Sequence, residues 1–92
     1  MRRIVEIQDA LPLQEDALMT EMIRALVSRP ESVRVETREP DEGTLVFRVF
    51  CDREDVGKVL GKRGSTIDCI RGYFIKVCAQ YGIRKVVIDI VD

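Results

Sequence analysis

The stretch Lys58–Ile67 constrains the fold of this chain more than any other part of the sequence. It reads Lys-Val-Leu-Gly-Lys-Arg-Gly-Ser-Thr-Ile, which predicts a short helix, a four-residue turn and the start of a second helix. The glycines at the two ends of the turn, Gly61 and Gly64, allow positive φ angles and a close approach of the backbone to another molecule. Ser65 and Asp68 form a capping-box pattern, with aspartate in place of glutamate, so the second helix is predicted to begin at the turn.

The turn combines several features that favour a phosphate group. A helix N-terminus carries free N–H groups and a partial positive charge, and Lys62 and Arg63 add two cations between the glycines. A Walker A loop is excluded, because Gly57 and Gly61 are one residue too close and Arg63 stands where the hydroxyl residue is needed. The sequence also contains no Gly-x-Gly-x-x-Gly dinucleotide-binding pattern. The turn is therefore a candidate phosphate site of a different class.

Charge is unevenly distributed along the chain, although the net charge is only −1. Residues 1–56 carry 8 Lys or Arg against 13 Asp or Glu, whereas residues 57–76 carry 5 Lys or Arg against 1 acidic residue. An acidic body with one cationic strip orients a polyanion onto the strip. An ordinary mixed-charge surface fits these totals equally well, so the charges alone do not decide the function.

The composition argues against an enzyme. A chain of 92 residues forms one small domain without room for a deep active-site cavity. It has no histidine, which removes the commonest general base and the commonest zinc ligand. We expect no catalytic residue, no metal site, no cofactor and no small-molecule substrate.

Neither the N-terminus nor any apolar run suggests export or membrane insertion. No signal peptide is visible, and no apolar run approaches the length of a membrane span. The three cysteines, Cys51, Cys69 and Cys78, lie in apolar runs at wide spacing, which predicts small buried side chains in a reducing compartment. These features predict a cytoplasmic protein without a membrane partner.

The N-terminal third divides into an extension and a helix. Residues 1–14 form the extension, in which Arg2–Ile7 either pairs as a short edge strand or lies on the surface. A helix entered at Pro12 is expected to run to about Ser28 and to end at Pro30. Its apolar residues recur at helical spacing and predict a broad core-facing stripe: Leu18, Met19, Met22, Ile23, Leu26 and Val27.

The remaining elements follow from alternation and turn residues. Two alternating runs joined by turn residues predict an antiparallel hairpin of strands 32–38 and 44–51. Asp52 caps a short helix over residues 53–60, which Gly61 closes, and a longer helix runs from Ser65 to about Tyr81. A last strand covers residues 84–91. The predicted order is α-β-β-α-α-β, an α+β fold in which three helices cover one face of a three-stranded mixed sheet.

This order, with Gly-x-x-Gly joining the second and third helices, resembles the type II KH fold. The run Gly57–Gly64 and the terminal strand Arg84–Val91 are similar to those of the small bacterial KH proteins of the KhpA (YlqC) family. The resemblance covers roughly residues 15–91, so residues 15–92 are assigned to a single KH domain and residues 1–14 to the extension.

The resemblance implies a cytoplasmic RNA-binding protein without enzymatic activity, similar to RNA chaperones or post-transcriptional regulators. It also implies pairing, either as a homodimer or with a larger Jag-domain protein of the KhpB type, and a link to cell elongation and division. Phe50, Tyr73 and Tyr81 are candidates for a pairing surface if they are exposed.

KH modules clamp about four nucleotides of single strand, and this scheme assigns a role to each residue near the turn. Gly61 and Gly64 allow close approach, while Lys62 and Arg63 neutralise phosphates. Amides of Ser65 and Thr66 add hydrogen bonds, and Lys58 and Arg71 extend the phosphate path. The bases follow an aliphatic groove lined by Val56, Ile67, Ile70 and either Val59 or Leu60, of which we take Val59 as the candidate.

A protein-interaction module is the alternative. In this interpretation the fold serves as an adaptor with little RNA binding, which suits the acidic N-terminal half and the small net charge. Salt dependence discriminates between the two, because RNA binding weakens by a log–log slope of about 0.7 for each phosphate neutralised on a single strand. An apolar protein contact responds little to salt.

Overall fold

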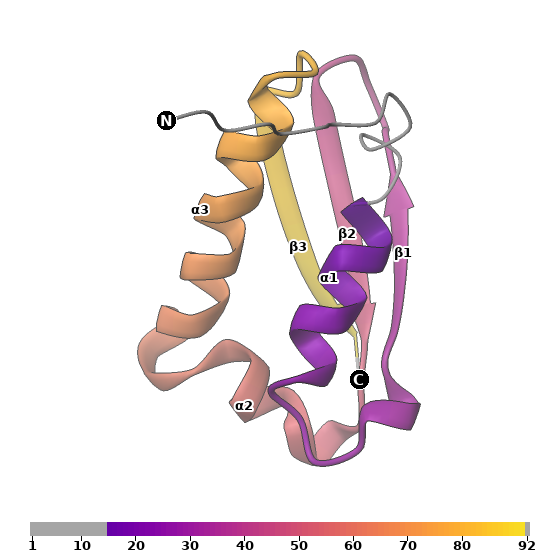
Figure 1. The fold of residues 1–92 in the computed structure, drawn as a ribbon, viewed down its shortest axis with the longest axis vertical. Helices are drawn as coiled ribbons and strands as arrows, with labels where there is room; N and C mark the ends of the chain where they lie inside the picture. Colours follow the sequence, from indigo (N-terminus) through magenta and orange to yellow (C-terminus); the bar gives the residue numbers. More distant parts are fainter. Residues whose placement is uncertain (1–14, 92) are drawn as a thin grey trace, which may run out of the picture.

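The computed structural model describes residues 15–91, and the predictions for residues 1–14 lie outside this part of the chain. The elements follow the predicted order (Figure 1). The described chain contains three α-helices, three strands and three short 3-10 helices. In chain order they are α1 (Glu15–Arg24), η2 (Pro30–Ser32), β1 (Arg34–Arg38), β2 (Thr44–Phe50), η3 (Arg53–Asp55), α2 (Val56–Leu60), η4 (Lys62–Gly64), α3 (Ser65–Ala79) and β3 (Lys85–Val91).

The strands form a three-stranded mixed sheet in the order β1-β2-β3. β1 pairs with β2 in antiparallel register, with Arg34 opposite Phe50, and this confirms the predicted hairpin. β3 runs parallel to β2, with Val91 beside Phe50. A parallel neighbour requires a long crossover, and α2, the Gly-x-x-Gly turn and α3 form it. The sheet topology therefore places the turn on the connection between β2 and β3.

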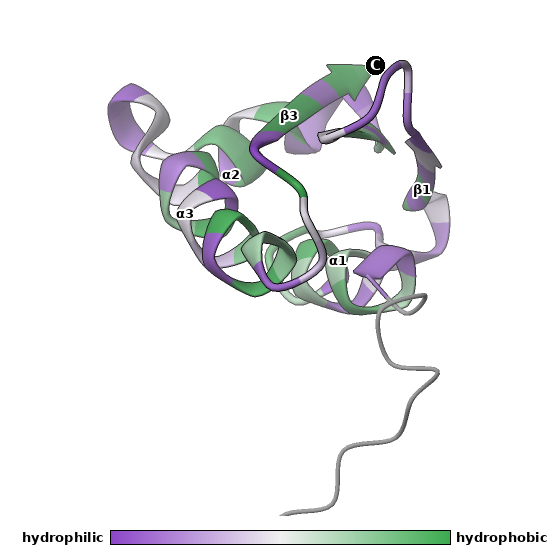
Figure 2. Ribbon diagram, turned by 90° about the horizontal axis from the view of Figure 1, so that it is seen from above, coloured by the Kyte–Doolittle hydropathy of each residue, from purple (hydrophilic) through white to green (hydrophobic). Residues whose placement is uncertain are grey.

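The helices lie on one side of the sheet, and the hydrophobic core fills the space between the two layers (Figure 2). Alternate residues of β2 point inward, so that Leu45, Phe47 and Val49 are buried. The ring of Phe47 meets that of Phe74 from α3 at a centroid distance of 4.9 Å. Met19 from α1 is fully buried in the same core. None of the helices in the described residues is long and apolar enough to cross a membrane.

Helix α1 ends at Arg24, four residues before the predicted end at Ser28. The amides of Ser28 and Arg29 donate to the carboxylate of Asp55, each at 3.1 Å, instead of to carbonyls one turn earlier in a helix. The chain leaves the helical path because these two amides have a partner elsewhere in the fold. The helix end predicted from Pro30 is therefore wrong, because it lies one helical turn too late in the chain.

Helix α3 also ends earlier than predicted, at Ala79. The amides of Tyr81 and Ile83 both donate to the Cys78 carbonyl, and Gly82 has a φ of 84°, which turns the chain away from the helix. Tyr81 consequently lies outside the helix and is exposed. Cys69 is exposed as well, contrary to the expectation that all the cysteines are buried, because it lines an open hollow between α1 and α3.

Candidate nucleic-acid interface

The Gly61–Gly64 turn has an unusual backbone, with positive φ at three of its four residues. Gly61 has a φ of 75°, Arg63 of 57° and Gly64 of 77°. The Gly64 amide donates to the Gly61 carbonyl at 3.1 Å, which closes a single 3-10 turn. Lys62 and Arg63 are both exposed. The turn therefore presents two cations to solvent from a tightly folded backbone.

The two glycines are required for different reasons. A Cβ atom on Gly61 would lie 2.8 Å from the amide nitrogen of Thr66 and would overlap the Thr66 side chain. A Cβ atom on Gly64 would have no atom within 4 Å, so only its left-handed φ favours glycine there. Gly61 is thus the point where the turn packs closely against the first turn of α3.

The predicted capping box is not present, although α3 does begin at Ser65. Ser65 itself is helical, with φ −64° and ψ −37°, and no side chain caps the helix. The Ser65 amide donates to the Lys62 carbonyl and is already used, contrary to its predicted role toward a phosphate. The carboxylate of Asp68 lies 3.8 Å from the Arg71 guanidinium instead. Positive φ at Arg63 and Gly64 turns the chain into the helix, which leaves Ser65 no capping position.

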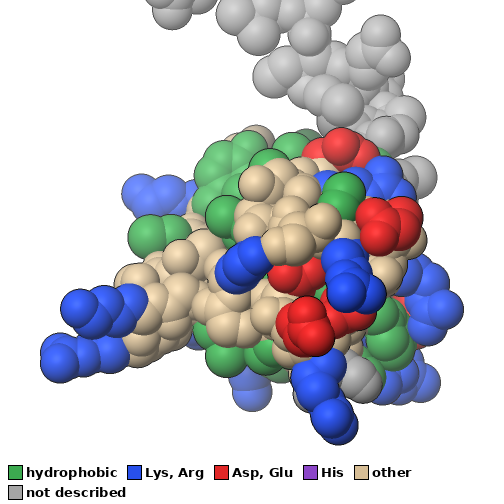
Figure 3. Space-filling view, turned by 90° about the horizontal axis from the view of Figure 1, so that it is seen from below, with side chains coloured by type: hydrophobic (Ala, Val, Ile, Leu, Met, Phe, Trp, Pro, Cys, Tyr) green, Lys and Arg blue, Asp and Glu red, His purple; other side chains and the backbone are tan. Residues whose placement is uncertain are grey.

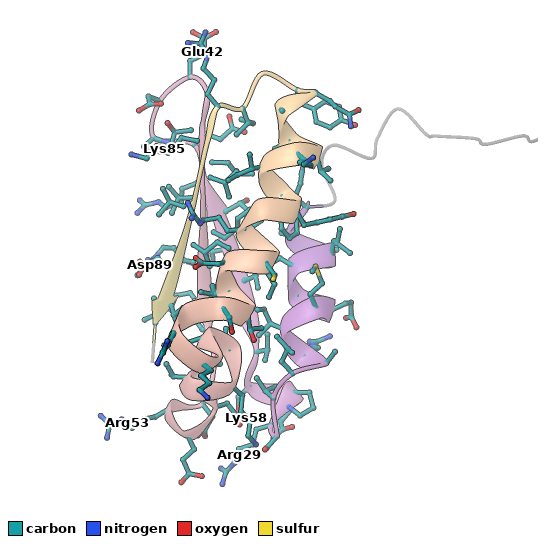
Figure 4. The ribbon with its side chains drawn as sticks, turned by 90° about the vertical axis from the view of Figure 1, so that its left-hand side faces the viewer. Arg29, Glu42, Arg53, Lys58, Lys85 and Asp89 are labelled. Carbon is teal, nitrogen blue, oxygen red and sulfur yellow. The ribbon has the colours of Figure 1, made fainter. Side chains whose placement is uncertain are left out.

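Lys58 lies apart from the turn. Its Nζ donates to the Ser28 hydroxyl and lies 3.6 Å from the Asp55 carboxylate. Figure 4 shows Lys58 and Arg29 close together at one end of the molecule. The predicted phosphate contact would require Lys58 to leave these two partners.

Asp55 is the one buried charged residue in the described chain, and the sequence reasoning did not single it out. Only 2% of its surface is exposed, and it accepts the backbone amides of Ser28 and Arg29. The Ser28 hydrogen bond is the main reason why the pKa of this carboxylate is lowered, although burial opposes the shift. The contact joins the segment after α1 to the start of α2. Because its partners lie far away in the sequence, no local pattern indicates it.

The structure corrects the choice of Val59 as a groove residue. Val59 is completely buried in the core, whereas Leu60 is 37% exposed and ends α2 beside the turn. On a helix, adjacent residues point in directions about 100° apart, so only one of them faces the core. Ile67 is half-buried against the core and Ile70 is buried in it, so both contribute mainly to packing.

Two open hollows flank α3, and they divide the predicted binding residues between them. One, of about 470 Å³, lies between α1 and α3 and includes Ser65 and Thr66. The other, of about 340 Å³, lies between α3 and β3 and includes Arg71 and Ile75. The structure therefore does not gather Thr66 and Arg71 into one groove.

Basic side chains project at the α2 end of the molecule, which Figure 3 shows from below. Acidic groups on the same face are held close to arginines, as where Asp52 lies 3.5 Å from Arg29. Among the described residues, neither Lys62 nor Arg63 takes part in an ion pair. In the described residues, no cluster of His, Cys, Asp or Glu is suited to a metal ion.

The three aromatic candidates for a pairing surface differ in exposure. Tyr73 and Tyr81 are 48% and 46% exposed. The Phe50 ring is half-buried on the outer face of the sheet, where the guanidinium of Arg34 lies 4.2 Å from its centroid and that of Arg48 lies 5.3 Å away. Of the three candidates for a pairing surface, the two tyrosines are therefore the more accessible.

The element order, the mixed sheet and a Gly-x-x-Gly turn between α2 and α3 define a KH domain of type II. Comparison with known proteins supports the same class of fold. The family model described as "KhpA/KhpB, KH domain" matches residues 16–90. The chain belongs to this family.

Several relatives share the family and are each named RNA-binding protein KhpA. The protein from Treponema pallidum is 35% identical over 85% of this chain and 95% of its own length. The proteins from Chlamydia pneumoniae and Streptococcus pneumoniae are 33% and 31% identical, over 68% and 78% of this chain and 80% and 90% of their own lengths. No solved structure matches the chain.

Proposed function

We propose that this protein binds single-stranded RNA with the Gly61–Gly64 turn and acts in the cytoplasm as an RNA chaperone or post-transcriptional regulator. The observation that carries the proposal is the backbone of the turn, which exposes Lys62 and Arg63 side by side. The related proteins named for RNA binding support the same ligand class.

The mechanism follows from the geometry of the turn. The absence of a Cβ atom at Gly64, where such an atom would face open space, allows a sugar–phosphate backbone to approach closely. Lys62 and Arg63 neutralise its phosphates, and Leu60 offers apolar surface to a base. Because no aromatic residue lies in the turn or next to it, base stacking contributes little. We therefore expect weak binding with little sequence selectivity.

Weak binding by one short clamp gives a physical reason for pairing. Two linked clamps raise the apparent affinity through effective concentration, without any new contact to RNA. We propose that the protein works as a homodimer or together with a KhpB-like partner. The exposed Tyr73 is the residue we would substitute first to test self-association.

The test compares the wild type with Lys62→Asp/Arg63→Asp by fluorescence anisotropy on a short unstructured RNA. Arg24→Asp/Arg38→Asp is the matched control, because it changes the net charge equally at two exposed positions outside the turn. We expect the turn variant to lose binding and the control to keep it, with unchanged circular dichroism for all the proteins.

Two other outcomes would contradict the proposal. Equal binding by the wild type and the turn variant would place RNA on another surface. No binding by any of the proteins, including the wild type, would favour a protein-interaction adaptor.

A further inference from the structure

Helix α2 is too short to hold its own position. It has five residues, and a helix of that length is marginal in water without packing from other parts of the chain. The Gly61–Gly64 turn continues directly from it, because the Gly61 amide donates to the Gly57 carbonyl at 2.9 Å. The contacts that fix α2 to the rest of the fold therefore also decide where the turn presents its cations.

Two side chains on different sides of α2 make such contacts. Val59 is completely buried and packs in the hydrophobic core. Lys58 precedes it and points about 100° away around the helix. Its Nζ donates to the hydroxyl of Ser28, 30 positions earlier in the chain, and lies 3.6 Å from the Asp55 carboxylate. Lys58 therefore joins α2 to the segment that follows α1.

The Asp55 carboxylate is the centre of this arrangement. It is buried and accepts the amides of Ser28 and Arg29, and Lys58 is three residues further along the chain. A buried carboxylate needs hydrogen bonds and a cation nearby to offset the loss of solvent, and Lys58 supplies the cation. Figure 4 shows Lys58 close to Arg29 at one end of the molecule. Ser28, Asp55 and Lys58 thus form one cluster, and the amino group of Lys58 is already engaged in it.

We propose that Lys58 is a positioning residue for RNA binding and not a phosphate contact. Its amino group holds α2 against the segment after α1, and α2 holds the Gly61–Gly64 turn where it meets the phosphates. Lys62 and Arg63 take part in no ion pair among the described residues, so their charges remain available to RNA. This inference rests on the proposed RNA binding at the turn and deepens it.

The test separates a positioning role from a direct contact by the salt dependence of RNA binding. Lys58→Met removes the amino group and keeps a long unbranched side chain. Lys62→Met makes the same change inside the turn, and Arg38→Met is the control that removes one positive charge at an exposed position on β1. Binding to a short oligouridylate is measured by fluorescence anisotropy over a range of salt concentrations, and circular dichroism checks the fold of each protein.

We expect Lys58→Met to bind RNA about fivefold more weakly than the wild type, the factor that one net hydrogen bond is worth. Its log–log salt slope should equal that of the wild type, because no phosphate contact is lost. Lys62→Met should weaken binding and also make the slope smaller by about 0.7. Arg38→Met should change neither quantity. Lys58→Arg keeps a charged donor and should restore most of the affinity.

Ser28→Ala tests the same cluster without changing any charge. It removes the hydroxyl that Lys58 contacts. If Lys58 acts by holding α2, Ser28→Ala should also weaken RNA binding with an unchanged salt slope. The double variant Ser28→Ala/Lys58→Met should then bind about as well as Lys58→Met alone, because both changes break one contact.

Three outcomes would overturn the inference. A smaller salt slope for Lys58→Met, as for Lys62→Met, would show that Lys58 contacts a phosphate directly. RNA binding by Lys58→Met equal to that of the wild type would show that the cluster does not position the turn. If the wild type itself binds no RNA, the proposed function fails and the inference fails with it.

Discussion

The Asp55 carboxylate accepts the backbone amide of Ser28 at 3.1 Å, across 27 positions of the sequence. Asp55 lies directly before α2, and α2 leads into the Gly61–Gly64 turn. Arg29 donates to the second oxygen of the same carboxylate. The contact therefore connects the end of the first helical segment to the base of the candidate RNA-binding turn.

Replacing this carboxylate should destabilise the fold. In Asp55→Ala the two amides lose their acceptor in a largely buried place, so we expect a fall in Tm of roughly 5–15 °C by thermal denaturation. Asp41→Asn, in an exposed turn, is the control and should change Tm little. An unchanged Tm for Asp55→Ala would show that the contact contributes nothing to stability.

The same carboxylate predicts a pH dependence. Its pKa is lowered in the folded state, so the stabilisation is complete above the ordinary value of 3.8 and is lost as pH falls below it. We expect the difference in Tm between the wild type and Asp55→Asn to narrow below that pH. Measurements from pH 6 down to about pH 2.5 test this, and a constant difference would contradict it.

The two glycines of the turn should differ in their tolerance of alanine. Gly61→Ala adds a positive-φ strain and an overlap with Thr66, so we expect a loss of more than about 2 kcal/mol in the free energy of unfolding. Gly64→Ala adds strain alone and should cost about 1 kcal/mol. Urea denaturation measures both, and equal losses would argue against the close packing at Gly61.

Replacing Arg63 should change the stability of the fold and the binding of RNA in opposite directions. Arg63 is the one non-glycine residue with positive φ in the described chain. Arg63→Gly relieves the left-handed strain, so the protein should be as stable as the wild type or more stable by about 1 kcal/mol. The same change removes one cation from the turn. We expect the log–log salt slope of RNA binding to decrease by about 0.7. Unchanged RNA binding would remove Arg63 from the proposed interface.

Alanine substitutions at Val59 and Leu60 should affect different properties: mainly the stability of the fold at Val59, and mainly RNA binding at Leu60. Val59→Ala opens a cavity in the core and should cost about 2 kcal/mol of stability. Leu60→Ala truncates a partly exposed side chain and should cost less than about 1 kcal/mol, while weakening RNA binding. Chemical denaturation and anisotropy on both variants provide the measurements. If Leu60→Ala binds RNA like the wild type, the groove surface lies elsewhere.

Local patterns in the sequence determined the element types and their order, and the resemblance to known KH proteins pointed to the topology. The alternation in residues 44–50 predicts a strand, and the glycines at 61 and 64 predict the turn between two helices, because the physical causes act within a few residues. Asp52 also accepts the Glu54 amide, at 2.9 Å, as a cap should, but the predicted helix over residues 53–60 is divided, so that Asp52 caps the 3-10 helix η3 and α2 begins only at Val56.

Only the tertiary structure decided which side chains meet. The end of α1 depends on Asp55, which is 27 positions from Ser28 and cannot be inferred from the residues around Pro30. Val59 and Leu60 are equally apolar neighbours, and only packing against the sheet determines which of them is buried. Arg84 lies with Arg71 along one hollow because the crossover brings β3 back beside α3. Such contacts depend on how whole elements pack, and local sequence carries little information about that.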